Sequence, residues 1–109
     1  MLKTLLESGV KEKILLYLMH NDQAYPTEIA RNFGFNLNAV QYQLLKLESA
    51  GVLYSQLKGK IRLYGFNPRY GMKKELLALL KKAFEFLSLE EKEQYYLKRR
   101  RPRKAGKPL

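Results

Sequence analysis

The amino-acid sequence predicts a mainly α-helical domain that carries one small β-hairpin. Apolar residues recur every three to four positions in several stretches, which is the spacing of amphipathic helices. Two short runs rich in β-branched and aromatic residues, VLYSQLK and IRLYGF, meet around Gly59 and predict the hairpin. The chain has 109 residues, of which 46% are hydrophobic, so we expect one domain with a packed core.

The composition argues against several classes of function. There is no cysteine and only one histidine, so disulfides, thiolate chemistry and a transition-metal site are not expected. The sequence shows no nucleophile with a base and no glycine-rich phosphate loop, so we expect neither an enzyme nor a cofactor. No apolar run is long enough for a membrane span, and the N-terminus is too charged for a signal peptide, so a soluble cytoplasmic protein is expected.

The net charge of +11 is concentrated in two blocks of the sequence. Residues 1–57 are neutral, and residues 58–74 carry six basic side chains and no acidic one. Residues 75–97 have a net charge of −2, and residues 98–109 carry seven basic side chains and no acidic one. A positive surplus of this size favours a polyanionic partner.

Residues 10–19 predict a helix that is apolar on two faces. One face holds Val10, Ile14, Tyr17 and Leu18, and the nearly opposite face holds Leu15 and Met19. A helix of this kind must be covered on two sides. Residues 2–8 predict a short helix before it.

Two further helices are predicted on either side of a glycine. Pro26 suits the first turn of a helix that Gly34 ends in a left-handed conformation. Asn36 is a good N-cap for the next helix, residues 37–50, which Gly51 ends. The buried stripe of this helix is Leu37, Val40, Leu44 and Leu47, and its outward residues are Asn38, Ala39, Gln41, Tyr42, Leu45 and Ser49. Two helices joined so closely form a helix-turn-helix.

The residues that follow predict the hairpin and two C-terminal helices. A three-residue loop at 58–60 places Leu57 opposite Ile61 and sorts apolar from polar side chains. Residues 73–87 predict a helix whose apolar face is wider than the roughly 100° arc of an ordinary surface helix. A capping box at 88–91 predicts a last helix that runs to Pro102.

Residues 9–67 resemble the winged helix-turn-helix domains of ArsR-like and MarR-like prokaryotic transcription regulators. The resemblance is carried by TEIARNFGFNLNAVQYQLLKLESAGVL (27–53) and by KGKIRLYGFNP (58–68). It implies a three-helix core with the hairpin as a wing, followed by C-terminal helices. It covers about half of the chain.

The resemblance implies that residues 37–50 are a recognition helix in the major groove of double-stranded DNA, with the basic wing at 58–62 on the backbone or in the minor groove. The implied DNA-binding residues are Thr27, Asn36, Asn38, Ala39, Gln41, Tyr42, Lys46, Lys58, Lys60 and Arg62. Asn38 and Gln41 offer the paired donor and acceptor that suit adenine. Leu45 departs from the family pattern, and either a thymine methyl group or a protein partner could contact it.

The chain is expected to divide into a winged helix-turn-helix domain at 1–72, dimerising helices at 73–101 and a disordered basic tail at 102–109. We expect a homodimer, because DNA-binding helix-turn-helix proteins commonly read two half-sites with two-fold symmetry. The expected interface residues are Leu15, Met19, Leu76, Leu77, Leu80, Phe84 and Leu87. The basic tail either contacts nucleic acid or only aids solubility.

These features predict a non-enzymatic, homodimeric transcription regulator that binds specific double-stranded DNA in the cytoplasm, in association with the nucleoid. Two alternatives stay open. The first is a protein-interaction module that acts as the small subunit of a two-component system, and the second is a basic protein that binds RNA or the ribosome. The lack of cysteine, with a single histidine, argues against the metal sensing found among ArsR-like proteins, and the sequence specifies no other effector.

Overall fold

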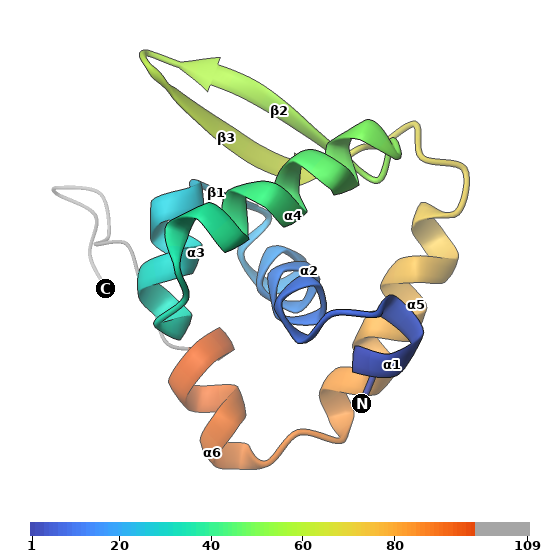
Figure 1. The fold of residues 1–109 in the computed structure, drawn as a ribbon. Coiled ribbons are helices and arrows are strands. Elements are labelled where there is room, and N and C mark those ends of the chain that lie inside the picture. Colours follow the sequence, from blue (N-terminus) through green and yellow to red (C-terminus); the bar gives the residue numbers. More distant parts are fainter. Residues whose placement is uncertain (98–109) are drawn as a thin grey trace, which may run out of the picture.

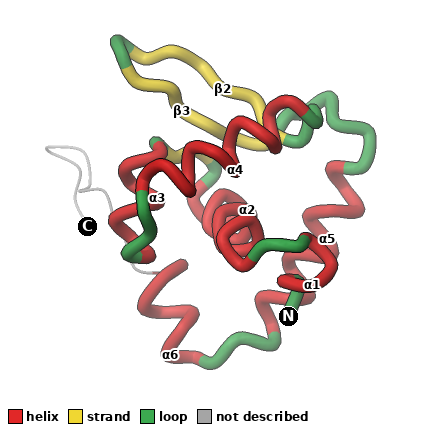
Figure 2. Tube along the Cα trace, viewed as in Figure 1, coloured by secondary structure: helices red, strands yellow, loops and turns green. Residues whose placement is uncertain are grey.

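The computed structural model describes residues 1–97 and shows packed helices from which a β-hairpin projects (Figure 1). The helices are α1 (Lys3–Leu6), α2 (Gly9–Asn21), α3 (Pro26–Phe33), α4 (Leu37–Ser49), α5 (Lys73–Glu85) and α6 (Leu89–Glu91), which continues into the wider helical segment η1 (Lys92–Leu97). The strands are β1 (Gln23–Ala24), β2 (Leu53–Lys58) and β3 (Ile61–Phe66). Helices therefore dominate the described chain (Figure 2), which confirms the predicted mainly α fold with a small hairpin.

α2 runs through the centre of the fold, with α4, α5 and η1 packed around it (Figure 1). Residues 14–18 of α2 are all buried. The prediction that this helix is covered on two sides is confirmed, and all the covers come from the same chain. Leu15 of α2 and Leu80 of α5 are only 1% and 0% exposed. Both are core residues that offer no surface to a second copy, which corrects their expected role in a dimer interface.

The ends of α3 and α4 follow the predicted signals. Pro26 begins α3, and Gly34 ends it with a φ of 72°, a left-handed conformation that suits glycine. Asn36 Oδ1 accepts hydrogen bonds from the backbone N–H groups of Asn38 at 2.8 Å and Ala39 at 3.4 Å, so Asn36 caps α4 as predicted. These ends fix the direction in which α4 leaves the turn, and with it the face of α4 that reaches solvent.

The hairpin pairs in a register that differs by one position from the predicted one. Lys58 pairs with Ile61, so the turn contains only two residues rather than three. Gly59 opens this turn with a φ of 65°, the positive value that two-residue hairpin turns favour. The predicted register relied on burial, but Leu57 and Ile61 are 60% and 51% exposed at the tip. Burial therefore does not select the register there, and the turn geometry does.

β1 has no counterpart among the predicted elements. It pairs antiparallel with β3, placing Gln23 opposite Gly65 and Ala24 opposite Tyr64, so the strand order is β1-β3-β2. Two residues are too few to show an alternating apolar pattern, which is why the sequence gives no signal for this strand. The pairing joins the base of the hairpin to the connection between α2 and α3.

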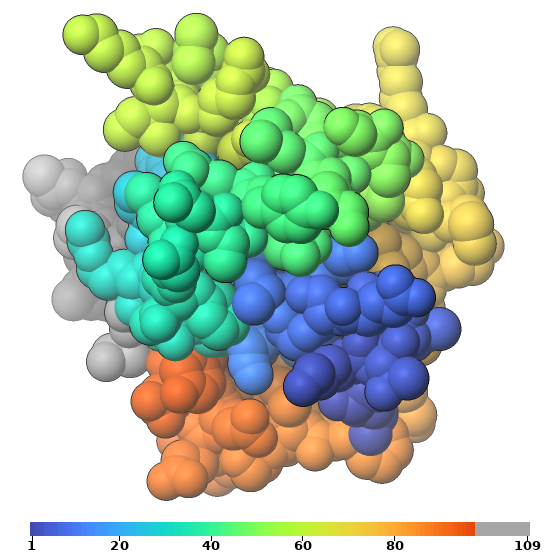
Figure 3. Space-filling view, viewed as in Figure 1, coloured from blue at the N-terminus to red at the C-terminus, as the bar shows by residue number. Residues whose placement is uncertain are grey.

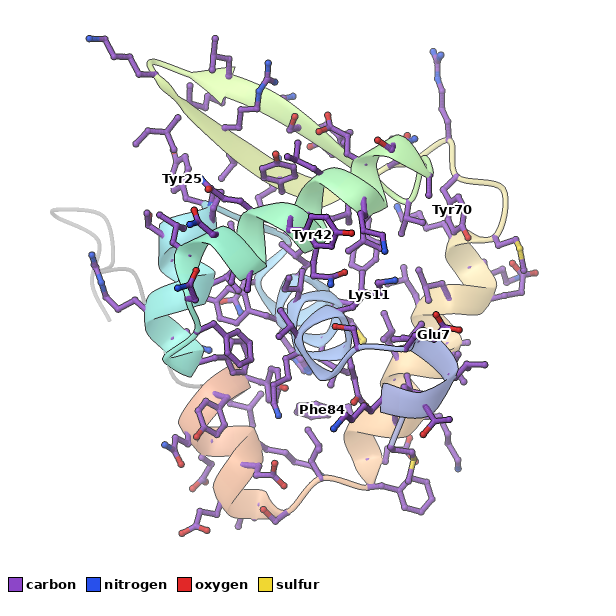
Figure 4. The ribbon with its side chains drawn as sticks, in the orientation of Figure 1. Glu7, Lys11, Tyr25, Tyr42, Tyr70 and Phe84 are labelled. Carbon is purple, nitrogen blue, oxygen red and sulfur yellow. The ribbon has the colours of Figure 1, made fainter. Side chains whose placement is uncertain are left out.

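The C-terminal helices complete the core around α2. Leu80 and Ala83 of α5 and Tyr96 of η1 are buried in the same cluster as the residues of α2. Phe84 points inward from α5 (Figure 4), and its ring centroid lies 4.1 Å from that of His20 and 5.7 Å from that of Tyr96. α5 and η1 are therefore parts of one core with the helix-turn-helix.

The predicted start of the last helix is confirmed, because Ser88 Oγ accepts a hydrogen bond from the backbone N–H of Glu91 at 3.1 Å. The predicted boundary at residue 72 falls in the loop before α5, and the functional division at that point stays a prediction. The expected continuation of the helix to Pro102 and the basic tail lie outside the described residues.

Candidate nucleic-acid interface

The outward face of α4 carries half of the side chains predicted to contact DNA. Asn38, Ala39, Gln41, Tyr42 and Lys46 are all exposed. Tyr42 extends from α4 in Figure 4 and is 59% exposed. On the other side, the predicted stripe of Val40, Leu44 and Leu47 is buried, whereas Leu37 at the start of the helix is 37% exposed. The sequence therefore assigns the two faces of α4 as the structure has them, apart from the first residue.

Asn36 lies at the edge of this face, and its side-chain oxygen is already engaged. It accepts two hydrogen bonds, both from backbone N–H groups of α4 to Oδ1. Only the amide Nδ2 is then left to face a ligand. A structural role as the cap of α4 accounts for this asparagine, and a DNA contact would come in addition.

The basic side chains of the wing, which we define as residues 53–66, are exposed at the end of the hairpin. The side chains of Lys58, Lys60 and Arg62 are all exposed to solvent. The space-filling view shows the hairpin standing over α3 and α4 (Figure 3). This places the charges of the wing on the side of the molecule that also holds the outward face of α4.

A hollow of about 510 Å³ lies between the wing, α4 and the start of α3, and we call it the wing hollow. Its polar lining is Thr27, Gln41, Lys60 and Arg62, and its apolar lining is Pro26, Leu45, Ile61 and Tyr64. Four predicted DNA-binding residues from three separate elements therefore meet at one place. The other predicted residues lie outside the wing hollow, along α4 and at the wing tip.

The apolar residues that line the wing hollow were not among the residues predicted to bind DNA. Leu45 is 55% exposed, and its outward position on a helical wheel was a usable signal. Ile61 and Tyr64 gave no such signal, because the sequence does not show which face of the hairpin turns toward α4.

A second hollow of about 560 Å³ lies along the outer side of α4 and is lined by Tyr42, Leu45, Lys46, Ser49 and Ala50. Lys46 Nζ lies 5.3 Å from the centroid of the Tyr42 ring, within the range of a cation–π contact. Leu45 thus borders hollows on both of its sides.

Ser55 connects an acidic and a basic side chain at the base of the wing. Its hydroxyl donates to Glu48 Oε2 at 2.7 Å and accepts from Arg62 Nη1 at 3.2 Å. Burial raises the pKa of the Tyr64 hydroxyl, the charge of Glu48 raises this pKa further, and the charge of Arg62 lowers it. The base of the wing is therefore less positive than the basic block at 58–74 alone indicates.

The remaining residues of the expected dimer interface are partly buried. Met19, Leu76, Leu77, Phe84 and Leu87 pack against the core with part of their surface free. Among residues 73–87, the large apolar side chains that are exposed are Leu79, at 39%, and Phe86, at 64%. Leu79 and Phe86 were not among the expected interface residues, although both lie on the wide apolar face predicted for this helix.

Within residues 1–97, no group of three or more His, Cys, Asp or Glu side chains is placed to hold a metal ion. None of the helices in this described part is both long and apolar enough to cross a membrane.

The comparisons with known proteins concern the fold. No protein-family model and no curated protein sequence matches this chain. The chain is similar to a solved structure of a double mutant of ZitR from Lactococcus lactis in its apo form, with a TM-score of 0.50 and 16% sequence identity. The similarity covers 84% of this chain and 78% of that one. The fold is a winged helix. At this identity the likeness concerns the fold alone, and the winged helix includes α3 and α4 as its helix-turn-helix.

Proposed function

We propose that this winged-helix protein is a transcription regulator that binds double-stranded DNA as a homodimer. In this proposal α4 is the recognition helix in the major groove, and the wing contacts the backbone or the minor groove. The wing hollow carries the proposal, because it brings Gln41 of α4, Thr27 of α3 and the basic residues of the wing to one surface. A polar helix face beside a basic hairpin suits the base edges and the phosphates of one duplex.

The residues have different roles in this proposal. Lys58, Lys60 and Arg62 give affinity that is independent of sequence, because they neutralise phosphates. Asn38 and Gln41 give discrimination, because an amide side chain matches the donor and acceptor of adenine. Ala39, Tyr42 and Lys46 border them on α4, Asn36 lies at the start of that helix, and Thr27 lies by a phosphate at the start of α3.

The homodimer and the location in the cytoplasm with the nucleoid belong to the same proposal. Two copies related by a two-fold axis would present two α4 helices to successive major grooves. The exposed Leu79 and Phe86 on the outer side of α5 support a contact between copies there. The proposal includes neither a catalytic activity nor a cofactor, and it leaves the effector open.

The proposal is tested by titrating the full chain onto fluorescent duplex DNA at low and at high salt. The double variant Lys58→Ala and Lys60→Ala should bind more weakly, and its dependence of log affinity on log salt should flatten by about 0.9 for each lost phosphate contact. Lys3→Ala with Lys13→Ala, on α1 and α2, removes the same charge from residues outside α4, the wing and α5, and should leave both quantities nearly unchanged. If the wild-type chain does not bind at low salt, or if its affinity does not fall as salt rises, DNA binding is the wrong function.

A protein-interaction module is the second candidate, and the apolar lining of the wing hollow favours it. Leu45 and Ile61 are both more than half exposed and both border this hollow. A stoichiometric partner that co-purifies with the chain, together with an absence of DNA binding, would support this alternative. Competition between duplex DNA and RNA in the same titration separates the proposal from RNA binding.

A further inference from the structure

Leu45 is a large apolar side chain in the middle of the polar outward face of α4. It lies one helical turn after Gln41 and Tyr42 and two turns after Asn38, so all four side chains share one face of the helix. With 55% of its surface exposed, Leu45 presents apolar area at the point where the proposed function places base edges. A single exposed leucine needs no explanation by itself, and its surroundings decide what it does.

The side chain of Leu45 projects from α4 into open space. It lines both the wing hollow and the second hollow, so space is open on two of its sides. Ile61, which is 51% exposed, continues the apolar surface on the wing side. A ligand that reaches this part of α4 therefore meets an aliphatic surface before it meets the backbone of the helix.

The charges around the two hollows indicate what kind of ligand fits. Lys60 and Arg62 line one hollow and Lys46 lines the other, and no acidic residue lines either of them. The occupant should therefore combine negative charge with a small apolar group. Duplex DNA meets both conditions, because the C5 methyl group of thymine is the apolar group that its major groove displays between the phosphates.

We propose that Leu45 contacts the C5 methyl group of a thymine in the major groove and makes affinity depend on that methyl group. The inference rests on the proposed DNA binding and adds a specificity-determining residue to it. Gln41 lies one turn earlier on the same face and suits adenine. The favoured site therefore contains an A·T pair at the position of Leu45, with an adenine contact one turn earlier along α4.

The test replaces thymine by uracil, which removes only the methyl group. Duplexes are first selected by the full-length chain from a random-sequence pool, and each thymine of the selected sequence is then replaced by uracil in turn. At one position the replacement should weaken binding by the wild-type chain about fourfold, which corresponds to the loss of one buried methyl group. The variant Leu45→Ala should bind the thymine and the uracil duplex equally at that position.

A matched variant keeps the test specific to Leu45. Leu5→Ala removes an exposed leucine from α1, outside the wing and both hollows, and it should retain the fourfold preference for thymine. Circular dichroism of each variant checks that the helices are retained.

The outcomes separate the inference from the function on which it rests. If the chain binds DNA but selects no sequence, or if no thymine replacement matters, or if Leu45→Ala keeps the preference, the inference is overturned while DNA binding stands. Preserved DNA binding by Leu45→Ala together with loss of a co-purifying protein would assign Leu45 to a protein contact instead. If the chain binds no duplex at any salt concentration, the proposed function fails, and the inference fails with it.

Discussion

Glu48 lies beside the basic wing, although it belongs to α4 and is outside the basic block at 58–74. Its carboxylate accepts from Ser55, whose hydroxyl also accepts from Arg62. An acidic side chain at this place lowers the local positive potential and holds the serine that orients Arg62. Counting charges along the sequence could not find this effect, because the residues involved come together only in the fold.

Replacing Glu48 by glutamine should therefore strengthen DNA binding. Glutamine keeps an oxygen that can accept from Ser55, but it removes the negative charge near the wing. We expect about two- to threefold tighter binding at low salt, and the gain should shrink at high salt because exposed charges are screened. Glu90→Gln on α6, which lies at the opposite end of the molecule from the hairpin (Figure 1), removes the same charge and should have little effect. Equal gains in both variants would show that only the net charge matters.

The partly buried position of His20 leads us to expect that the stability of the fold depends on pH. Partial burial lowers its pKa below the ordinary value of 6.5. The unfolded chain therefore takes up a proton at a higher pH than the folded chain does, and the free energy of unfolding should fall as the pH drops below about 6.5. Denaturant titrations at a series of pH values measure this, and His20→Gln should reduce the slope in that window. An equal slope in the variant would assign the pH dependence to other groups.

At the scale of the element, the helix-turn-helix is the part that the sequence predicts best. Pro26, Gly34 and Asn36 each act within one or two residues of the helix end that they fix, so their effect can be deduced without knowledge of the fold. The hairpin register depended on the type of turn at Gly59 rather than on burial, and the prediction was one position off. β1 escaped prediction because pairing with β3 defines it, and that pairing joins residues about forty positions apart.

Asn36 and Asn38 are expected to have different roles, the first in the stability of α4 and the second in DNA recognition. Asn36→Ala removes the cap and should lower the free energy of unfolding by about 1 kcal/mol. Asn38→Ala removes an exposed side chain that makes no cap, so it should leave stability nearly unchanged and should reduce the selectivity for adenine. Thermal unfolding and binding to adenine-substituted duplexes measure the two effects. A large loss of stability in Asn38→Ala would contradict this division of roles.

At the scale of the whole molecule, α2 organises a single core that both halves of the chain share. The apolar pattern of α2 showed correctly that it needs covers on two sides. The pattern could not show whether the helices that pack on these two faces belong to the same chain or to a second copy. The sequence of one helix does not specify which element packs against it. For this reason Leu15 and Leu80 were expected at a dimer interface and are found in the core. Leu79 and Phe86 are the large apolar side chains of residues 73–87 that remain exposed.

Leu80 and Phe86 should therefore respond differently to substitution. Leu80→Ala creates a cavity in the core and should lower the free energy of unfolding by about 2–5 kcal/mol. Phe86→Ser changes an exposed residue, so it should hardly affect the stability of the monomer and should weaken the proposed dimer. Sedimentation experiments on the folded variant report the second effect. A dimer that Phe86→Ser and a further Leu79→Ser both leave intact would place the contact elsewhere.

The central claim is that α4 and the wing form one surface for duplex DNA. Amide chemical shifts of the full chain, recorded while a short duplex is added at low salt, test this claim most directly. We predict that signals from residues 37–46 and 58–62 shift together and saturate at the same DNA concentration. The signals of α5 should shift by a smaller amount. Shifts confined to α5, or an absence of shifts on α4 and the wing, would contradict the claim.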